Sequence, residues 1–379
     1  MPSIAVVRST YSPYGGVEKV TLTIVRELLD MEIKVTLLTL PGQRWPLVHP
    51  NLQVIPVGIR WGNRLWQAWI FNHFVNKYLS THSFDCIFAL ERISRFTHFH
   101  AGGGTHKTFL KIKNENSSII EAVFRKMSLF HAYTLYLEKK GFSNPGLKKI
   151  QCCSKMVLND IQTDYRLNSD KLQLIYNGIE WQEIGKTFQN RFIIADEIRK
   201  KHQISPDWNC LLFLGSGFSR KGLDIAIEGL AALPGYYHLL VIGKNSYRAY
   251  FRQALKAGIA HRVHFLGSQE KGWGYASVCK ALVLPSYYEP FGLAPAEAHA
   301  MGIPVLVSDK TGYSEWILTG KNGVILQSPM TGDRIGKSFS ELARIIEHPE
   351  MTSDEIRNHV RELDNKIVYG KLIRDFLIL

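Results

Sequence analysis

The chain has 379 residues, so its length favours two domains rather than one. Apolar residues make up 45% and charged residues 21%, as in ordinary globular proteins, and no apolar run reaches the ~18 residues of a membrane-spanning helix. The formal net charge of +13 indicates an anionic partner, which is nucleic acid, anionic lipid or a small anionic substrate.

Basic residues are concentrated in the segment Arg92–Lys149, which holds eleven Lys and Arg against three Glu. No RNA-recognition signature, zinc finger or helix-turn-helix pattern accompanies this charge, so nucleic acid is the least favoured partner. The five cysteines show no Cys-x-x-Cys spacing, which favours reduced, buried thiols over disulfides or zinc. The N-terminus has too short an apolar core for a signal peptide, and we therefore expect a cytoplasmic protein.

Strands and helices alternate through the first half of the chain. An apolar strand at 3–9 is followed by a Gly-Gly turn and by an amphipathic helix at 17–30. Further strands are expected at 34–40, 52–57 and 84–90. This alternation predicts a parallel sheet covered by helices.

The segment 61–79 interrupts that alternation with an aromatic-rich helix. Apolar side chains recur in it at helical spacing, namely Trp66, Trp69, Ile70, Phe74 and Tyr78. We favour the interpretation that this face packs into the core. The alternative is that it lies on a bilayer, because aromatic residues beside Lys and Arg suit that interface.

A second alternation begins near Asn209. Strands are expected at 209–217, 237–243, 262–268, 280–286 and 303–309, with helices at 223–233, 248–258 and 295–302. The chain therefore contains two doubly wound halves. We expect an N-terminal domain at 1–182, a C-terminal domain at 183–364, and a closing helix at 365–379 that packs back on the first domain.

The loop "GSGFSRKG" follows an expected strand and precedes an expected helix, so its amides form an anion site. Arg220 and Lys221 add two positive charges suited to a diphosphate. Gly215 and Gly217 also invite a dinucleotide-binding interpretation, but Arg220 stands where that fingerprint requires its third glycine. The alternative is a Gly-rich turn with solvated basic residues.

The stretch "YYEPFGLAPAEA" carries Glu289 and Glu297 after the expected strand at 280–286, at the sheet edge where open parallel sheets bind ligands. We place Pro295 at the first helical position and Glu297 in the first helical turn. Ala294 cannot complete a capping box with Glu297, which favours a ligand for this carboxylate. A less favoured alternative is that the two carboxylates are the acid and the base of a glycoside hydrolase.

Together these segments resemble the retaining, nucleotide-sugar-dependent glycosyltransferases of family 4. The segment "EPFGLAPAEAHAMGIPVLVSDKTGYSEWI" resembles that family's signature of two glutamates with seven residues between them, and "GSGFSRKGLDIAIEGLAAL" resembles its phosphate-binding loop. "YSPYGGVEKV" and "NGVIL" are similar to further family segments, in the same order. The resemblance implies the GT-B fold, in which two Rossmann-like doubly wound domains face each other across a cleft. It also implies an N-terminal acceptor domain and a C-terminal donor domain.

The resemblance also implies residue roles. Glu297 would bind the donor ribose, Glu289 the hydroxyls of the donor sugar, and Arg220 with Lys221 the diphosphate of the leaving group. The other implied donor contacts are Gly15, Gly16, Gly215, Gly267, Ser268, Phe291, Gly292, Leu293 and Ala294. The chain has no Asp-x-Asp pair, so we expect a metal-independent reaction without a cofactor.

The segment "FHAGGGTHKTFL" resembles a loop of the lipopolysaccharide-core glucosyltransferases and their relatives. His106 matches the histidine of that subgroup, which implies a role beside the reacting sugar, whereas a structural loop histidine is the alternative. Gly103 stands where the subgroup has an aspartate. His98 and His100 lack a nearby acid at ligand spacing, which disfavours a metal site.

We therefore expect transfer of a hexose-type unit, with retention, from a nucleotide diphosphate sugar, most simply a UDP-sugar, to a cell-envelope glycolipid such as lipopolysaccharide core. The basic N-terminal half implies peripheral contact with the anionic inner face of the cytoplasmic membrane. Two alternatives stay open: a nucleotide-sugar epimerase of GT-B fold and a non-catalytic nucleotide-sugar or glycan-binding relative.

Overall fold

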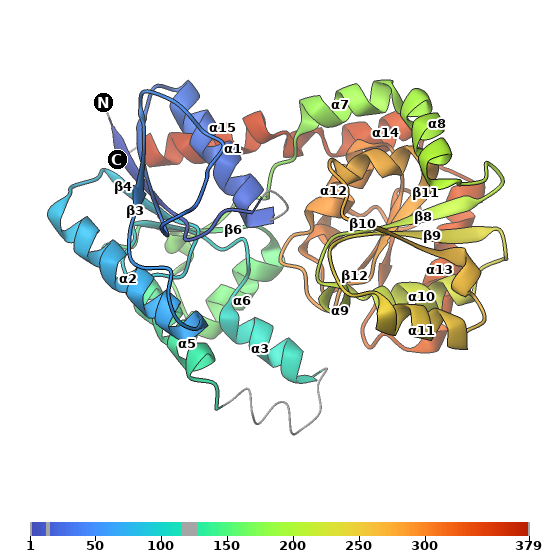
Figure 1. The fold of residues 1–379 in the computed structure, drawn as a ribbon, viewed down its shortest axis with the longest axis horizontal. Helices are drawn as coiled ribbons and strands as arrows, with labels where there is room; N and C mark the ends of the chain where they lie inside the picture. Colours follow the sequence, from blue (N-terminus) through green and yellow to red (C-terminus); the bar gives the residue numbers. More distant parts are fainter. Residues whose placement is uncertain (1, 13–15, 116–126, 378–379) are drawn as a thin grey trace. The chain divides into compact units, whose positions relative to one another are not determined.

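A computed structural model describes residues 2–12, 16–115 and 127–377 (Figure 1). The chain divides into two compact units. Unit 1 comprises residues 1–178 and 365–379, and unit 2 comprises Ile179–Asp364. The boundary lies before the expected one at 182 because the helix α7, Trp181–Gln189, packs on unit 2, where the Arg357 guanidinium lies 3.8 Å from the Trp181 ring centre.

Unit 1 is built on a parallel sheet of seven strands in the order β3-β2-β1-β4-β5-β6-β7. Its strands are β1 Ser3–Val7, β2 Lys34–Thr39, β3 Leu52–Pro56, β4 Cys86–Ala89, β5 His98–His100, β6 Lys149–Cys152 and β7 Leu172–Leu174. Its helices are α1 Gly16–Asp30, α2 Arg64–Thr81, α3 His106–Glu115, α5 Leu129–Phe142, α6 Lys155–Tyr165 and α15 Asn365–Leu377.

The closing helix α15 shares the core of unit 1 with α1. Tyr369, Ile373 and Phe376 of α15 are buried in one cluster with the apolar face of α1 and the strands β1, β2 and β4. The Tyr369 hydroxyl also accepts a hydrogen bond from the Gly178 amide at 3.2 Å. The end of the chain therefore folds with its beginning.

The helix α2 exposes most of the aromatic face that we expected to be buried. Trp66, Trp69 and Phe74 are exposed, whereas the buried side chains of α2 are Phe71, Val75 and Leu79. The core-packing interpretation of the aromatic stripe is therefore wrong. The three buried residues recur at a spacing of four and form a second apolar stripe, which is the buried side of α2.

Unit 2 is built on a parallel sheet of six strands in the order β10-β9-β8-β11-β12-β13. Its strands are β8 Asn209–Leu214, β9 Tyr237–Ile242, β10 Val263–Gly267, β11 Cys279–Leu284, β12 Val305–Ser308 and β13 Gly323–Leu326. Its further helices are α8 Arg191–His202, α9 Phe218–Lys221, α10 Leu223–Ala231, α11 Arg248–Lys256, α12 Leu293–Ala300, α13 Gly332–Glu347 and α14 Ser353–His359.

Helices cover both faces of the unit 2 sheet. The helix α10 packs against α11 and α13, whereas α12 packs against α7 and α14, and Figure 1 shows α10 and α12 on opposite sides of the strands. The fold of two doubly wound parallel sheets is thereby confirmed. In each sheet the strand order reverses once, between β1 and β4 in unit 1 and between β8 and β11 in unit 2.

The cysteines and the two strand histidines lie in the interior, as expected. All five cysteines are buried, and none of them forms a disulfide. His98 and His100 are buried on β5, where burial lowers the pKa of each ring to about 4. Among the helices that the structure describes, none is both long and apolar enough to span a bilayer.

Candidate functional site

The candidate site lies where the strand order of the unit 2 sheet reverses. The loop after β8, residues 215–222, and the loop after β11, residues 285–292, leave the sheet from neighbouring strands. Ligands of open parallel sheets bind in the crevice at such a switch point. The topology therefore brings together the basic loop and the first glutamate that the sequence singled out.

Three charged side chains from these two loops form one ion-pair cluster. Arg220 Nη1 and Lys221 Nζ each lie 2.8 Å from Glu289 Oε2. Arg220 Nη1 also donates to the Tyr288 carbonyl at 2.7 Å, and the Tyr287 amide donates to the Arg220 carbonyl at 2.9 Å. The cluster has a net charge of +1, so it presents an organised positive surface to an anion.

The two cations keep the Glu289 carboxylate ionised although it is largely buried. Burial alone raises the pKa of Glu289, but the charges of Lys221 and Arg220 outweigh it and lower the pKa to about 2. The Glu289 backbone is fixed as well, because its amide donates to the Lys310 carbonyl and its carbonyl accepts from the Gly312 amide. Glu289 is therefore an ionised hydrogen-bond acceptor in a rigid position.

The basic loop is held against β11 by a glycine. Gly222 has φ +73°, and a Cβ at this position would lie 2.0 Å from the carbonyl oxygen of Pro285. Gly222 also separates the four-residue α9 from α10. The expected helix after the loop is confirmed as α10, which begins at Leu223, and the loop itself contains the short helix α9. The basic residues Arg220 and Lys221 therefore lie at the end of α9, directly before the N-terminus of α10.

We expect Gly222→Ala to destabilise the protein by at least about 2 kcal/mol more than Gly258→Ala, because forcing atoms into a packed position costs about 1–3 kcal/mol. Gly258 is the matched control, since its φ is +72° and no atom lies within 4 Å of its virtual Cβ. Both variants share the cost of a left-handed backbone. Urea unfolding of the two variants gives the difference, and equal losses would show that the loop does not depend on this close approach.

The second glutamate lies on α12, close behind the same loop. The helix begins at Leu293 after Gly292, so Pro295 is its third residue and not its first. Pro295 is still tolerated, because the first amides of a helix have no intrahelical partner. Glu297 is the fifth residue, beyond the first turn where we expected it, and it is buried.

The remaining expected donor contacts of unit 2 surround this cluster. Leu293 and Ala294 are partly exposed at the start of α12. The Phe291 side chain is buried against Tyr313, with ring centres 5.7 Å apart, and the Phe291 carbonyl accepts a hydrogen bond from the Tyr313 amide at 2.7 Å. Gly215 faces Lys221, because a Cβ there would lie 2.7 Å from Lys221 Cε.

The ends of β9 and β10 extend the site away from the cluster. The Gly243 amide donates to the Gly267 carbonyl at 2.9 Å, and Ser268 follows on the exposed end of β10. Asn245 lies after β9, and its side chain accepts a hydrogen bond from the Gly217 amide. The sequence did not single out Asn245, whose only signal was its place directly after an expected strand.

His106 lies in unit 1 as the first residue of α3. Its amide donates to both oxygens of the Glu138 carboxylate, at 2.9 and 3.0 Å, and its ring lies 3.0 Å from His131. Burial, with the charges of Arg92 and His131, lowers the pKa of His106 to about 3. The ring is therefore uncharged at neutral pH.

Glu138 is a further residue that the sequence did not single out. Its side chain is fully buried, and besides His106 it binds Arg92 Nε at 3.2 Å and the Tyr165 hydroxyl. Arg92 in turn donates to the Gly104 carbonyl at 2.9 Å. The loop that carries Gly103 is thus held at the Gly104 carbonyl by Arg92, which is itself paired with the buried Glu138 carboxylate.

Gly103 has room for a side chain, because no atom lies within 4 Å of its virtual Cβ. The backbone therefore does not require glycine at this position. Gly16 is the exposed first residue of α1, and Gly15 lies outside the described residues. Within the described part of the chain, no three His, Cys, Asp or Glu side chains are grouped as a metal site.

Two family models match the chain, one on each half. The model described as "Glycosyltransferase Family 4" matches residues 14–183, and the model described as "Glycosyl transferases group 1" matches residues 194–359. The chain is 24% identical over 338 residues to the lipopolysaccharide glucosyltransferase WaaG of Escherichia coli K12, with 86% of each chain covered.

Two solved structures show the same fold. The crystal structure of WaaG matches with a TM-score of 0.78 at 19% identity and covers 99% of both chains. The structure of HepE from Anabaena in complex with UDP-glucose matches with a TM-score of 0.73 at 16% identity and covers 100% of both chains.

The two doubly wound sheets and these structural matches define a protein of the GT-B fold. The matched families and relatives make it a glycosyltransferase. Its residues 14–183 match the family 4 model, its residues 194–359 match the group 1 model, and the chain is similar to a lipopolysaccharide glucosyltransferase.

Proposed function

We propose that the protein transfers a hexose-type unit from a UDP-sugar to a hydroxyl of a cell-envelope glycolipid such as lipopolysaccharide core, with retention of the anomeric configuration. The observation that carries this proposal is the ion-pair cluster of Arg220, Lys221 and Glu289 at the switch point of unit 2. The similarity to a lipopolysaccharide glucosyltransferase supports the acceptor, and the fold match to a UDP-glucose complex supports the donor.

The chemistry follows from the charges of the cluster. When the glycosyl bond to UDP breaks, negative charge develops on the departing diphosphate. Fixed cations that already point at this charge lower the barrier, because they need no reorganisation during the step. Arg220 and Lys221 are held in place by Glu289 before any donor arrives, so they meet this requirement.

The two glutamates serve different parts of the donor in this proposal. Glu289 is ionised and accepts hydrogen bonds from the sugar hydroxyls, while Glu297 accepts from the ribose hydroxyls. The loop amides between them, at Leu293 and Ala294, face the diphosphate. Gly267 and Ser268 contact the base through their backbone, and Gly16 is a further donor contact in this proposal.

His106 contributes as a neutral hydrogen-bond partner of the reacting sugar. Its lowered pKa of about 3 excludes a role as a cation at neutral pH. Retention proceeds by substitution on one face of the sugar, with the departing phosphate accepting the proton of the acceptor hydroxyl, as the family resemblance implies. The reaction takes place at the inner face of the cytoplasmic membrane, where the basic unit 1 contacts anionic lipid.

Thermal unfolding with a panel of nucleotides and nucleotide sugars tests the donor. A ligand at 100 times its dissociation constant stabilises the native state by about 2.7 kcal/mol, which is a measurable rise in melting temperature. We expect the largest rise with UDP and a UDP-sugar. A larger rise with GDP or ADP compounds would contradict the proposed donor.

We expect activity to survive EDTA, because Arg220 and Lys221 supply the positive charge that a divalent cation supplies elsewhere. UDP release is measured before and after chelation, and again after Mg²⁺ and Mn²⁺ are restored. Equal rates in all three conditions support the proposal. Loss of activity with EDTA and its recovery with a divalent cation would contradict it.

A further inference from the structure

The exposed face of α2 carries a continuous aromatic stripe. Trp66, Trp69, His73 and Asn76 recur at helical spacing and therefore share one face. The Trp66 and Trp69 rings meet edge to face at 5.8 Å, and Trp69 stacks on His73 at 5.7 Å. Trp66 is 52% and Trp69 47% exposed. Two neighbouring tryptophans that are half in solvent indicate a surface that something covers.

The helix α5 packs beside α2 and continues this surface. Leu129, Tyr133, Tyr136 and Lys140 share one of its faces by the same helical spacing. Leu129 is 71% and Tyr136 52% exposed, and the Tyr133 and Tyr136 rings stack at 6.0 Å. The two helices thus present one aromatic face, which we call the α2–α5 face and define by Trp66, Trp69, Leu129 and Tyr136.

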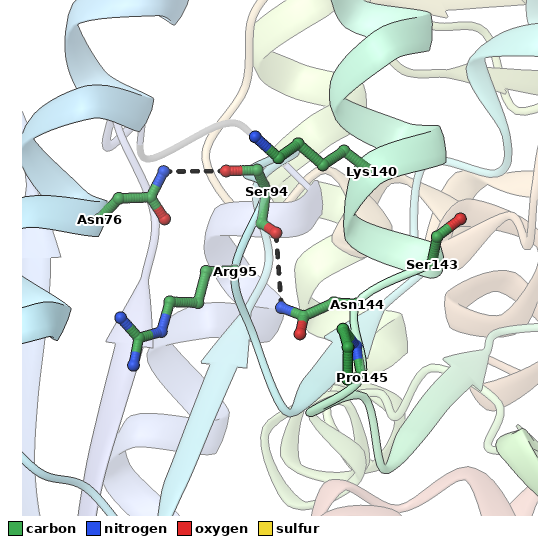
Figure 2. Close-up of a pocket in the computed structure, with 7 residues that line it drawn as sticks. All are labelled: Asn76, Ser94, Arg95, Lys140, Ser143, Asn144 and Pro145. Atoms are coloured by element: carbon green, nitrogen blue, oxygen red, sulfur yellow. Dashed lines mark hydrogen bonds between the residues drawn. The ribbon is translucent and has the colours of Figure 1, made fainter.

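An open basic pocket adjoins the α2–α5 face. It has a volume of about 580 Å³ and is lined by Asn76, Ser94, Arg95, Lys140, Ser143, Asn144 and Pro145 (Figure 2). Ser94 is held by Asn76, whose Nδ2 donates to its hydroxyl at 2.8 Å, and by Asn144, which donates to its carbonyl at 3.4 Å. The wall of the pocket beside Arg95 is therefore fixed.

The charges of this surface have one sign. Arg95 and Lys140 form no ion pair with a described carboxylate, and the Lys140 ammonium rests 5.5 Å from the Tyr136 ring centre. The helix α2 contains no acidic residue, and the only acid of α5 is Glu138, whose side chain is fully buried. An anionic partner therefore meets no repelling carboxylate from either helix.

We propose that the α2–α5 face docks on an anionic phospholipid bilayer, with the basic pocket taking a lipid headgroup phosphate. Tryptophan and tyrosine rings favour the boundary between headgroups and acyl chains, and cations beside them favour anionic lipid. The observations favour a bilayer over a protein partner because the aromatic stripe and the unpaired cations occur together on it. This assignment rests on the proposed membrane role and specifies the surface that performs it.

Cosedimentation with vesicles tests the docking surface. The vesicles consist of phosphatidylcholine alone or of phosphatidylcholine with phosphatidylglycerol, and the full chain is used without donor or acceptor. We expect binding only to the second kind. Two double variants test the face, namely Trp66→Ala with Trp69→Ala and Arg95→Gln with Lys140→Gln. Each should lower the partition coefficient about tenfold or more. For the second, the reason is that one cation near an anionic surface contributes about fivefold.

Matched controls come from unit 2. Phe192→Ala with Ile193→Ala removes two exposed apolar side chains, and Arg252→Gln with Lys256→Gln removes two exposed cations of α11. Both control pairs should bind vesicles within about twofold of the unaltered protein. They remove the same kinds of side chain, but from unit 2 and not from the α2–α5 face. Losses equal to those of the α2–α5 pairs would overturn the proposal.

Two further results distinguish the alternatives. The Arg95→Gln, Lys140→Gln variant could lose affinity for soluble glycerol 3-phosphate but still bind vesicles normally. In that case the pocket binds a free phosphate, and the proposal is overturned. UDP release with a deacylated, water-soluble acceptor is measured on the same variants and should be unchanged. If the unaltered protein binds anionic vesicles but transfers no sugar, the proposed function fails while the docking surface stands.

Discussion

Lys221→Ala should lower kcat about 100-fold or more and leave UDP binding within about tenfold, because removal of one preorganised donor to a developing anion costs about 10²–10³ in kcat. Lys221 is only 12% exposed and is directed by Glu289, so its charge acts at a fixed place. Its attraction for bound UDP is smaller than its attraction for the more concentrated charge of the departing group. Turnover and calorimetric titration with UDP give the two quantities.

Two variants control this experiment. Lys221→Arg keeps the charge and should recover part of the lost rate, and Lys256→Ala removes an exposed cation of α11 and should behave like the unaltered protein. Circular dichroism confirms that each variant is folded. If kcat and the dissociation constant for UDP change by the same factor, Lys221 binds the donor without favouring the transition state, and the assigned role is wrong.

Glu297→Ala should weaken UDP binding by about 100-fold or more. A hydrogen bond to a charged group contributes about 1.5–3 kcal/mol, two ribose hydroxyls provide two such bonds, and 1.4 kcal/mol corresponds to a factor of ten. The side chain is buried on α12, so water does not readily replace the ribose as its partner. Glu228→Ala on the exposed side of α10 is the control acid in the same unit.

A ligand that lacks the ribose hydroxyls isolates the contact. 2′,3′-Dideoxy-UDP should bind the unaltered protein about as weakly as UDP binds Glu297→Ala, and the variant should not distinguish the two ligands. Such a cycle measures the pairwise interaction without assuming that the variant is otherwise intact. If the variant loses equal affinity for both ligands, Glu297 acts through the structure of α12 and not through the ribose.

The sheets were predictable because their strands are continuous apolar runs. The runs at β1, β2, β8, β9 and β11 are buried along nearly their whole length, as parallel strands covered on both faces require. The strands β5 and β7 have three residues each, and β6 contains Lys149 and Gln151, so none of them forms such a run. These strands were not predicted because pairing with neighbours, and not local sequence, specifies them.

The error in α2 has a different cause. Helical spacing in this segment is satisfied by two stripes, one with Trp66 and Trp69 and one with Phe71 and Val75. Periodicity identifies an apolar face but does not say which of two apolar faces is buried. In the folded unit 1, the stripe with Phe71 and Val75 is buried, and the stripe with Trp66 and Trp69 is exposed to solvent.

Part of the candidate site could be found from sequence because its residues lie in two short segments. Arg220, Lys221 and Glu289 were singled out by spacing and resemblance, and the topology explains why they meet. Their common ion pair was not foreseen, because the segments are far apart in the chain. Glu138 was hidden for the same reason, since its partners Arg92, His106 and Tyr165 come from three other segments.

The most direct test of the proposed reaction combines the purified protein, a UDP-sugar and a lipopolysaccharide-core acceptor, with UDP release and the anomeric configuration of the product measured together. We predict UDP release that depends on the acceptor and a product sugar with the same anomeric configuration as in the donor. Conversion of the donor to free or isomerised sugar without acceptor, or a product with inverted configuration, would contradict it.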